Sequence, residues 1–117
     1  DETREFRILY GSLDPDAFAV LPKTFPDLRE LVLWSPSGSD ISRLDVFPQL
    51  AKFISDYDNL ITVKEARRLR HQESLTSVHI EKGESEEVFG ILKELPLIEE
   101  LSVFVTLENG EELDYEL

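Results

Sequence analysis

The chain has 117 residues, of which 41% are hydrophobic and 32% charged, and this composition indicates one folded globular domain. Its 25 acidic and 12 basic side chains give a net charge of −13. A field of that sign repels phosphate backbones and anionic lipids, so it argues against a nucleic-acid or membrane partner and favours a basic one. The absence of cysteine excludes a disulfide framework, a thiolate metal site and a thiol nucleophile.

The sequence also bounds the compartment. No apolar run approaches the roughly 20 residues that a membrane-spanning helix needs, and no signal peptide is recognisable. The lack of cysteine leaves the compartment open, and our default expectation is a cytoplasmic or nuclear protein. The chain begins at Asp1 and contains no methionine, so the single domain expected over residues 1–117 is compatible with a fragment of a larger protein.

The first part of the chain is predicted to alternate strands and helices. Residues 4–10 form a predicted strand, and Asp14 followed by Pro15 marks the start of a helix, because this pair suits a helix cap and first turn. The segment 28–34 is the next predicted strand. Apolar residues three apart within 41–47 then predict a short helix.

The segment from Leu50 to Asp56 is ambiguous. Its apolar residues predict another strand, but Ser55 stands where an aliphatic residue is expected, and the segment is also compatible with an extension of the preceding helix. Thr62 and Glu65 then form a capping box, which opens a predicted helix over 63–71.

The last third of the chain gives the clearest pattern. Residues 75–81 alternate as in a strand, and Ser85 is expected to cap the next helix. The buried stripe of that helix is predicted to be Val88, Ile91, Leu92 and Leu95. Residues 98–107 predict a longer strand, and 108–111 predict a type I′ turn. Residues 113–117 are therefore expected to pair back antiparallel and to shield the sheet edge.

An L-x-x-L-x-L pattern at Leu28, Leu31 and Leu33 recurs along the chain. It begins again, with substitutions, at Thr3, Leu50, Leu75 and Ile98. Successive starts are 22 to 25 residues apart, which is the spacing of a leucine-rich repeat solenoid.

The segments FPDLRELVLW and LPLIEELSVF resemble leucine-rich repeats, specifically the irregular kind that follows F-box domains in large eukaryotic families. The resemblance implies an α/β fold: a short solenoid of about five β–α units with a mainly parallel sheet and a C-terminal hairpin. The asparagine ladder of these repeats is absent, because its positions hold Gly11, Pro36, Asp58, Gly83 and Thr106. No F-box segment is present, so a ubiquitin-ligase role would require sequence outside this chain. The alternative fold is a compact single-domain α/β sandwich without a repeat origin.

In the repeat register, the residues between the buried positions point out of the sheet. One predicted column holds Arg7, Val32, Ile54, His79 and Ser102, and the column beside it holds Leu9, Trp34, Asp56, Glu81 and Phe104. Aromatic and aliphatic residues at outward positions are typical of a protein-binding patch. The predicted partner-binding residues are Arg7, Val32, Trp34, Ile54, His79, Glu81 and Phe104. The alternative is that helices cover this face too and bury these residues.

No catalytic, nucleotide-binding or cofactor motif is found, and we predict neither an enzyme nor a cofactor or metal site. The two histidines, His71 and His79, lie on different predicted elements. The segment 56–59 starts like a calcium loop but lacks the glycine and the final glutamate that such a loop requires. Acidic neighbours of Ser85 disfavour an anion at that helix start.

Basic residues gather in one place, the predicted helix over 63–71. They are Lys64, Arg67, Arg68, Arg70 and His71, and they indicate either a docking motif or a solvated face held by salt bridges.

Two functional hypotheses follow from the whole sequence. The first is a module that recognises a protein partner, favouring a basic one, through the sheet face. The alternative is a small acidic inhibitor or immunity-type protein that neutralises a basic enzyme. The oligomeric state stays open.

Overall fold

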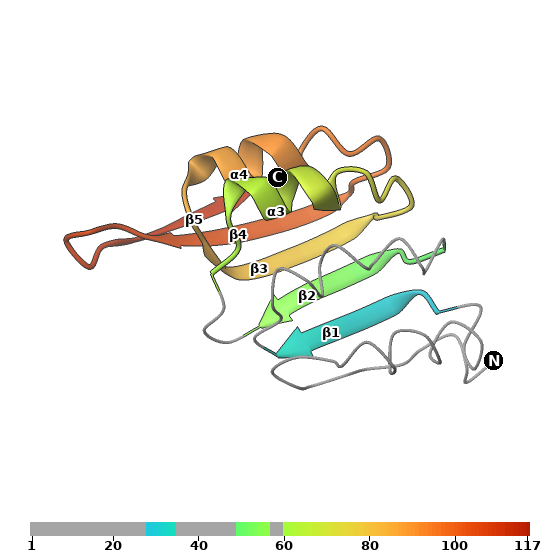
Figure 1. The fold of residues 1–117 in the computed structure, drawn as a ribbon, viewed down its shortest axis with the longest axis horizontal. Helices are drawn as coiled ribbons and strands as arrows, with labels where there is room; N and C mark the ends of the chain where they lie inside the picture. The colour runs from blue at the N-terminus through green and yellow to red at the C-terminus, as the bar shows by residue number, and fades with distance from the viewer. Residues whose placement is uncertain (1–27, 35–48, 57–59) are drawn as a thin grey trace.

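The computed structural model describes residues 28–34, 49–56 and 60–117, which contain five strands and two helices (Figure 1). In chain order these elements are β1 (Glu30–Trp34), β2 (Lys52–Asp56), α3 (Val63–Leu69), β3 (Ser77–Gly83), α4 (Glu86–Leu92), β4 (Glu100–Thr106) and β5 (Glu112–Glu116). The predicted strand over 4–10 and the predicted helices at Asp14 and 41–47 lie outside the described residues.

The strands form one sheet in the order β1-β2-β3-β4-β5. Strands β1 to β4 are parallel to their neighbours, and β5 is antiparallel to β4. The expected α/β class with a mainly parallel sheet is confirmed. Each parallel strand lies beside the strand that precedes it in the chain, so the sheet grows in one direction from β1.

The lateral register of the parallel strands follows the spacing of the sequence pattern. One row of aligned residues is Leu31, Phe53, Val78 and Leu101, and the row two residues further on is Leu33, Ser55, Ile80 and Val103. The ambiguous segment is thus the strand β2. The side chain of Ser55 is only 1% exposed, and its hydroxyl has no hydrogen-bond partner within the described part of the chain.

The starts of the strands are tied together by a repeated backbone contact. The carbonyl oxygen of Arg29 accepts hydrogen bonds from two successive N–H groups at the start of β2, those of Ala51 (2.8 Å) and Lys52 (2.8 Å). The carbonyl of Ala51 accepts from the N–H groups of residues 76 (2.7 Å) and 77 (3.0 Å), and that of residue 76 accepts from residues 99 (2.8 Å) and 100 (3.0 Å). The same local geometry therefore fixes the start of each new strand.

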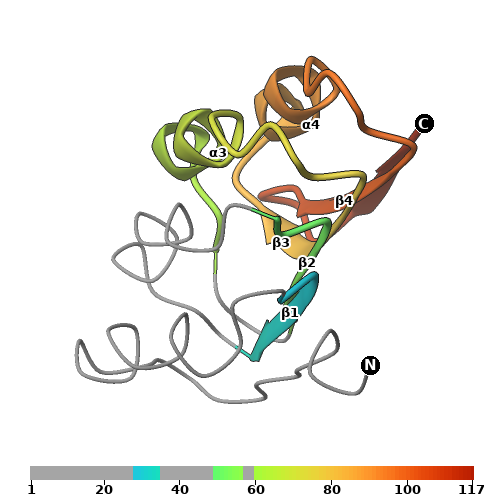
Figure 2. The same ribbon diagram turned by 90° about the vertical axis from the view of Figure 1, so that its right-hand side faces the viewer.

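Both helices lie on the same face of the sheet, as the two views show (Figures 1 and 2). The apolar side chains that they bury are Ala66 and Leu69 from α3 and Val88 and Leu92 from α4, which join one core with the buried strand residues. Because successive strand residues point to opposite faces, the residues between these core positions lie on the other side of the sheet. We call that side the outer face.

The helix starts agree with the sequence prediction. The N–H of Glu65 donates to the hydroxyl of Thr62 and the N–H of Thr62 donates to the carboxylate of Glu65, both at 3.2 Å, so the capping box is confirmed. The N–H of Val63 also donates to the carboxylate of Glu84 at 3.2 Å. These bonds satisfy amides that a helix start leaves without a partner. Helix α3 ends at Leu69, two residues before the predicted end.

Helix α4 is capped by Ser85, whose hydroxyl accepts a hydrogen bond from the N–H of Glu87 at 3.3 Å. Of its predicted stripe, Val88, Leu92 and Leu95 are buried. Ile91 is only half-buried and packs against the edge of the core. The cap is confirmed, and the stripe is narrower than predicted.

The β4–β5 hairpin confirms the predicted antiparallel return, but its turn differs from the prediction. The N–H of Gly110 donates to the carbonyl of Leu107 (2.9 Å), and the N–H of Leu107 donates to the carbonyl of Glu111 (2.7 Å). The loop is therefore three residues long, with Gly110 at a φ of 85°, as in a type I turn followed by a glycine bulge. The predicted two-residue type I′ turn over 108–111 was wrong, because Gly110 serves as the bulge residue.

Candidate functional site

The outer face extends over β2, β3, β4 and β5, opposite the helices. Its side chains are half-buried or exposed, as the alternating burial of β3, β4 and β5 shows. They are Lys52, Ile54, Ser77, His79, Glu81, Glu100, Ser102, Phe104, Thr106, Glu112, Asp114 and Glu116. Neither described helix covers this face, so the second helix layer that we considered as an alternative is not seen in the described part of the chain.

A contact cluster of three predicted residues lies on β3 and β4. The Nε2 atom of His79 is 2.8 Å from the Oε1 atom of Glu81. The ring of His79 meets the ring of Phe104 edge-on, with centroids 5.7 Å apart. The side chains of His79 and Glu81 are 32% and 41% exposed, so the cluster remains accessible to a partner. Its polar pair and its aromatic ring can serve recognition, and the pair holds the imidazole in one orientation.

Ile54 lies beside this cluster in the sheet. Its register partner on β3 is His79, and His79 in turn is aligned with Ser102 on β4. Ile54 is half-buried, as is Phe104. The structure therefore places an aliphatic residue, a histidine and an aromatic residue on one continuous area of the outer face.

The remaining predicted site residues are placed only in part. Arg7 lies outside the described residues. The backbones of Val32 and Trp34 lie in β1, aligned with Ile54 and Asp56 respectively, which agrees with the predicted columns. The side chains of Val32 and Trp34 are outside the described part, so their contribution to the face stays a prediction.

The second predicted column crosses an irregularity in β3. Ile80 is aligned with Val103 but Gly83 with Val105, so β3 carries one extra residue between these points, which is a β-bulge. Counting along the sequence aligns Glu81 with Phe104, and the register shifts at this point. The ring of Phe104 contacts His79, its diagonal neighbour on the same face. A Cβ atom on Gly83 would lie 2.8 Å from the Cγ1 atom of Val103, so this close approach requires glycine.

The acidic row on β5 was missed by the sequence reasoning. Glu112, Asp114 and Glu116 are exposed and are aligned with outer-face residues of β4, whereas Leu113 and Tyr115 between them are half-buried. The alternation of acidic and apolar residues was visible in the predicted strand over 113–117. The sequence alone did not show which face of the sheet the acidic residues occupy, because that depends on the register between β5 and β4.

The outer face is predominantly acidic. Glu81 and Glu100 lie on it with the three carboxylates of β5, and all five are exposed. Lys52 has its Nζ atom 4.0 Å from the Oε1 atom of the buried Glu30 on β1, which offsets part of the lysine charge. This arrangement concentrates negative potential where the aromatic cluster is accessible, and it attracts a basic partner.

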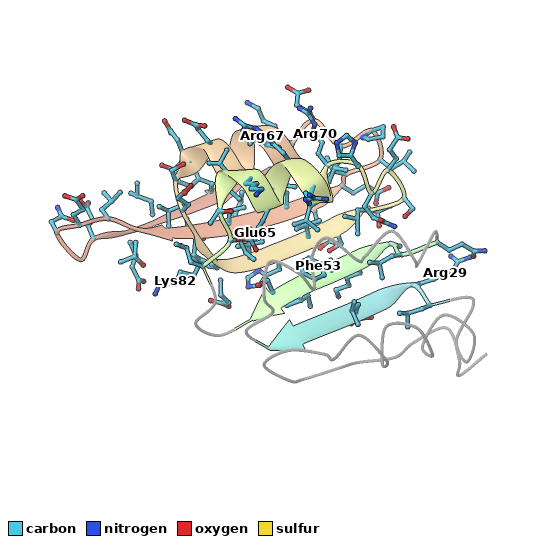
Figure 3. All side chains as sticks on the ribbon, viewed as in Figure 1. Arg29, Phe53, Glu65, Arg67, Arg70 and Lys82 are labelled. Carbon is cyan, nitrogen blue, oxygen red and sulfur yellow. The ribbon has the colours of Figure 1, made fainter. Side chains whose placement is uncertain are left out.

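The basic cluster lies away from the outer face, on and just after α3. Lys64, Arg67, Arg68, Arg70 and His71 are all exposed, and Figure 3 labels Arg67 on α3 and Arg70 just after it. The salt bridges that one interpretation expected are not found among the described residues. A hollow of about 540 Å³ beside the helix ends is lined by Arg70, His71, Glu73, Glu94 and Pro96, all exposed. Its mixed charges give it no single ligand chemistry.

Other candidate sites of the sequence receive no support. Among the described residues, no group of three or more side chains is arranged to hold a metal ion. Most of the calcium-like segment 56–59 is outside the described part. Of the helices that are described, none is both long and apolar enough to cross a membrane.

Comparison with protein-family models, with curated proteins and with solved structures gives no match to this chain.

Proposed function

We propose that this chain is a non-enzymatic recognition module, a short leucine-rich-repeat-like solenoid that binds a protein partner through its outer face. The repeat interpretation is supported by four parallel strands in chain order, by their pattern-matched register and by the repeated carbonyl contact at the strand starts. Side chains that point out of a repeat sheet are the usual means by which solenoids bind partners.

The observation that carries the function is the accessible cluster around Phe104. An aromatic ring packed edge-on against His79, beside the half-buried Ile54, provides apolar contact area at a sheet face that no described helix covers. Aromatic residues in such patches supply much of the binding free energy at protein interfaces. The acidic surroundings favour a basic partner and speed the encounter. The expected compartment is cytoplasmic or nuclear.

The test is affinity capture from a lysate with the wild-type chain, with Phe104→Ser and with Leu97→Ser as a matched control. Leu97 is 56% exposed, follows α4 and is not on the outer face, so its loss removes a similar apolar surface elsewhere. We expect a protein that the wild type and Leu97→Ser retain and Phe104→Ser loses. Binding of that protein is then measured with purified components. If every captured protein is independent of Phe104, the outer face is not the recognition surface.

The acidic inhibitor is a second candidate, favoured by the five exposed carboxylates of the outer face. It predicts a different response, because binding that is dominated by charge weakens steeply as salt screens it. In that case the captured protein is basic, survives Phe104→Ser and is lost in high salt or when Glu100 and Glu116 are both changed to glutamine.

A further inference from the structure

Along the free edge of β5, backbone groups have no partner strand among the described residues, and acidic and apolar side chains lie on opposite faces of the sheet. β5 is the last strand of the sheet, and within the described residues nothing pairs with its second edge. The hydrogen bond from the N–H of Leu107 to the carbonyl of Glu111 and that from the N–H of Leu117 to the carbonyl of Leu101 set the phase of the ladder.

That phase decides which backbone groups point outwards. In an antiparallel ladder, residues with both backbone groups directed to the partner alternate with residues whose groups point away. Residues 113 and 115 therefore face β4. The N–H and C=O groups of Glu112, Asp114 and Glu116 face the free edge, where an added strand would meet them.

The side chains along this edge differ between the two faces of the sheet. The three carboxylates of Glu112, Asp114 and Glu116 are on the outer face and exposed. On the helix side, Leu113 and Tyr115 are half-buried, and the ring of Tyr115 lies 5.8 Å from that of Phe89 on α4. The edge thus carries negative charge on the outer face. On the helix side it carries a partly exposed apolar surface formed by Leu113, Tyr115 and Phe89, which we call the apolar shoulder.

The same pattern disfavours a second copy of this chain. If β5 paired with another β5, the outward-facing residues of both strands would be opposite one another, and acidic residues would meet acidic residues. Like charges in directly opposite positions destabilise strand pairing, and charged edge strands are a known means of preventing it. The occupant must therefore carry the opposite charge.

We propose that an extended segment of a partner protein binds to the free edge of β5 as an additional strand. Basic and apolar residues alternate in this segment. Its basic side chains lie opposite Glu112, Asp114 and Glu116, and its apolar side chains extend the shoulder of Leu113, Tyr115 and Phe89. Main-chain hydrogen bonds supply affinity and the alternating side chains supply specificity, as in other cases of strand addition. This inference rests on the proposed function and names the chemistry of the partner.

The first experiment measures binding of fluorescein-labelled peptides to the whole chain by anisotropy. The probes are a seven-residue peptide of alternating lysine and valine and a scrambled peptide of the same composition. We expect the alternating peptide to bind at least about tenfold more tightly, because only it can direct all lysines to one face of a strand. Equal binding of both peptides, or binding of neither, overturns the proposal.

The second experiment separates position from net charge. The triple variant Glu112→Gln, Asp114→Asn, Glu116→Gln is compared with Glu86→Gln, Glu87→Gln, Glu94→Gln, which removes three exposed carboxylates on and beside α4. The change in net charge is identical. We expect the β5 triple variant to weaken the alternating peptide about tenfold and the α4 triple variant to leave it within about twofold. Equal effects of the two variants contradict a site at the edge.

The third experiment reads the backbone directly. Amide hydrogen exchange measured by NMR is expected to slow at Asp114 and Glu116 when the alternating peptide binds, because the edge amides become hydrogen-bonded. Asp114→Pro removes an N–H group that points to the free edge, and we expect this variant to lose binding of the alternating peptide. Asp114→Asn removes the same negative charge but keeps the N–H group, and we expect it to retain most of the binding. If these amides stay unprotected, the acidic row only attracts cations. A partner that depends on Phe104 and ignores the β5 variants would leave the proposed function intact and refute this edge.

Discussion

The two faces of the sheet are built from the same strands and differ in how far their side chains are buried. On the helix side, Phe53, Val78 and Val103 are at most 1% exposed and share one core with both helices. One residue further along each strand, Ile54, His79 and Phe104 are only half-buried. Alternate residues of one strand belong to different faces, so core residues and the residues that we propose for recognition are adjacent in the sequence.

The largest expected effect comes from a pair of phenylalanines that differ in face. Phe53, labelled on β2 in Figure 3, is fully buried, and Phe53→Ala is expected to lower the free energy of unfolding by about 3–5 kcal/mol. Phe104→Ala, on the outer face, is expected to cost about 1 kcal/mol or less. Urea denaturation of both variants measures the difference. Comparable losses would mean that the outer face is also part of the core.

A second pair of substitutions tests how closely β3 approaches β4 on the core side. Gly83→Ala would bring a Cβ atom within 2.8 Å of Val103, and we expect it to cost about 1–3 kcal/mol. Gly90→Ala, in the middle of α4, meets no atom within 4 Å and should stabilise by about 0.5–1 kcal/mol, because alanine favours helices. Thermal unfolding shows whether each variant is more or less stable than the wild type. A stabilising effect of Gly83→Ala would refute the close packing at the bulge.

The smallest effect concerns the one serine in the buried row of β2. The hydroxyl of Ser55 is buried without a partner in the described residues, and leaving such a group unpaired costs free energy. Ser55→Ala is therefore expected to be neutral or to stabilise by about 1 kcal/mol. Ser102→Ala on the outer face should change stability by less than about 0.5 kcal/mol. A loss above 1 kcal/mol in Ser55→Ala would reveal a hydrogen bond to this hydroxyl.

Most of the described elements and the strand register were predictable because they depend on local pattern, although β2 was also compatible with a helix. The spacing of Leu31, Phe53, Val78 and Leu101 gave the alignment of four strands, and the Thr62–Glu65 capping box gave the start of a helix. These signals involve neighbours in the sequence or a regular period, so no tertiary contact is needed to recognise them.

The details that were missed depend on contacts between distant residues. The bulge in β3 follows from the approach of Gly83 to Val103, which no local pattern records. The turn type follows from which residue of the loop, Gly110 or its neighbour, pairs with Leu107. The acidic row of β5 required the register with β4 before its face was known. In the candidate site, the contact between the rings of His79 and Phe104 was likewise not predicted, because it joins residues of two different strands.

The shared carbonyls at the beginnings of the strands have a consequence for how such a sheet can change. Because the starts of β2, β3 and β4 are each held to the preceding strand, an extra residue in β3 is accommodated at the opposite end, as the bulge before Gly83 illustrates. The strand starts are thus fixed relative to one another, whereas the strand ends can vary in register. The spacing of outer-face side chains near the strand ends can therefore change while the strand starts, and the core beside them, keep their positions.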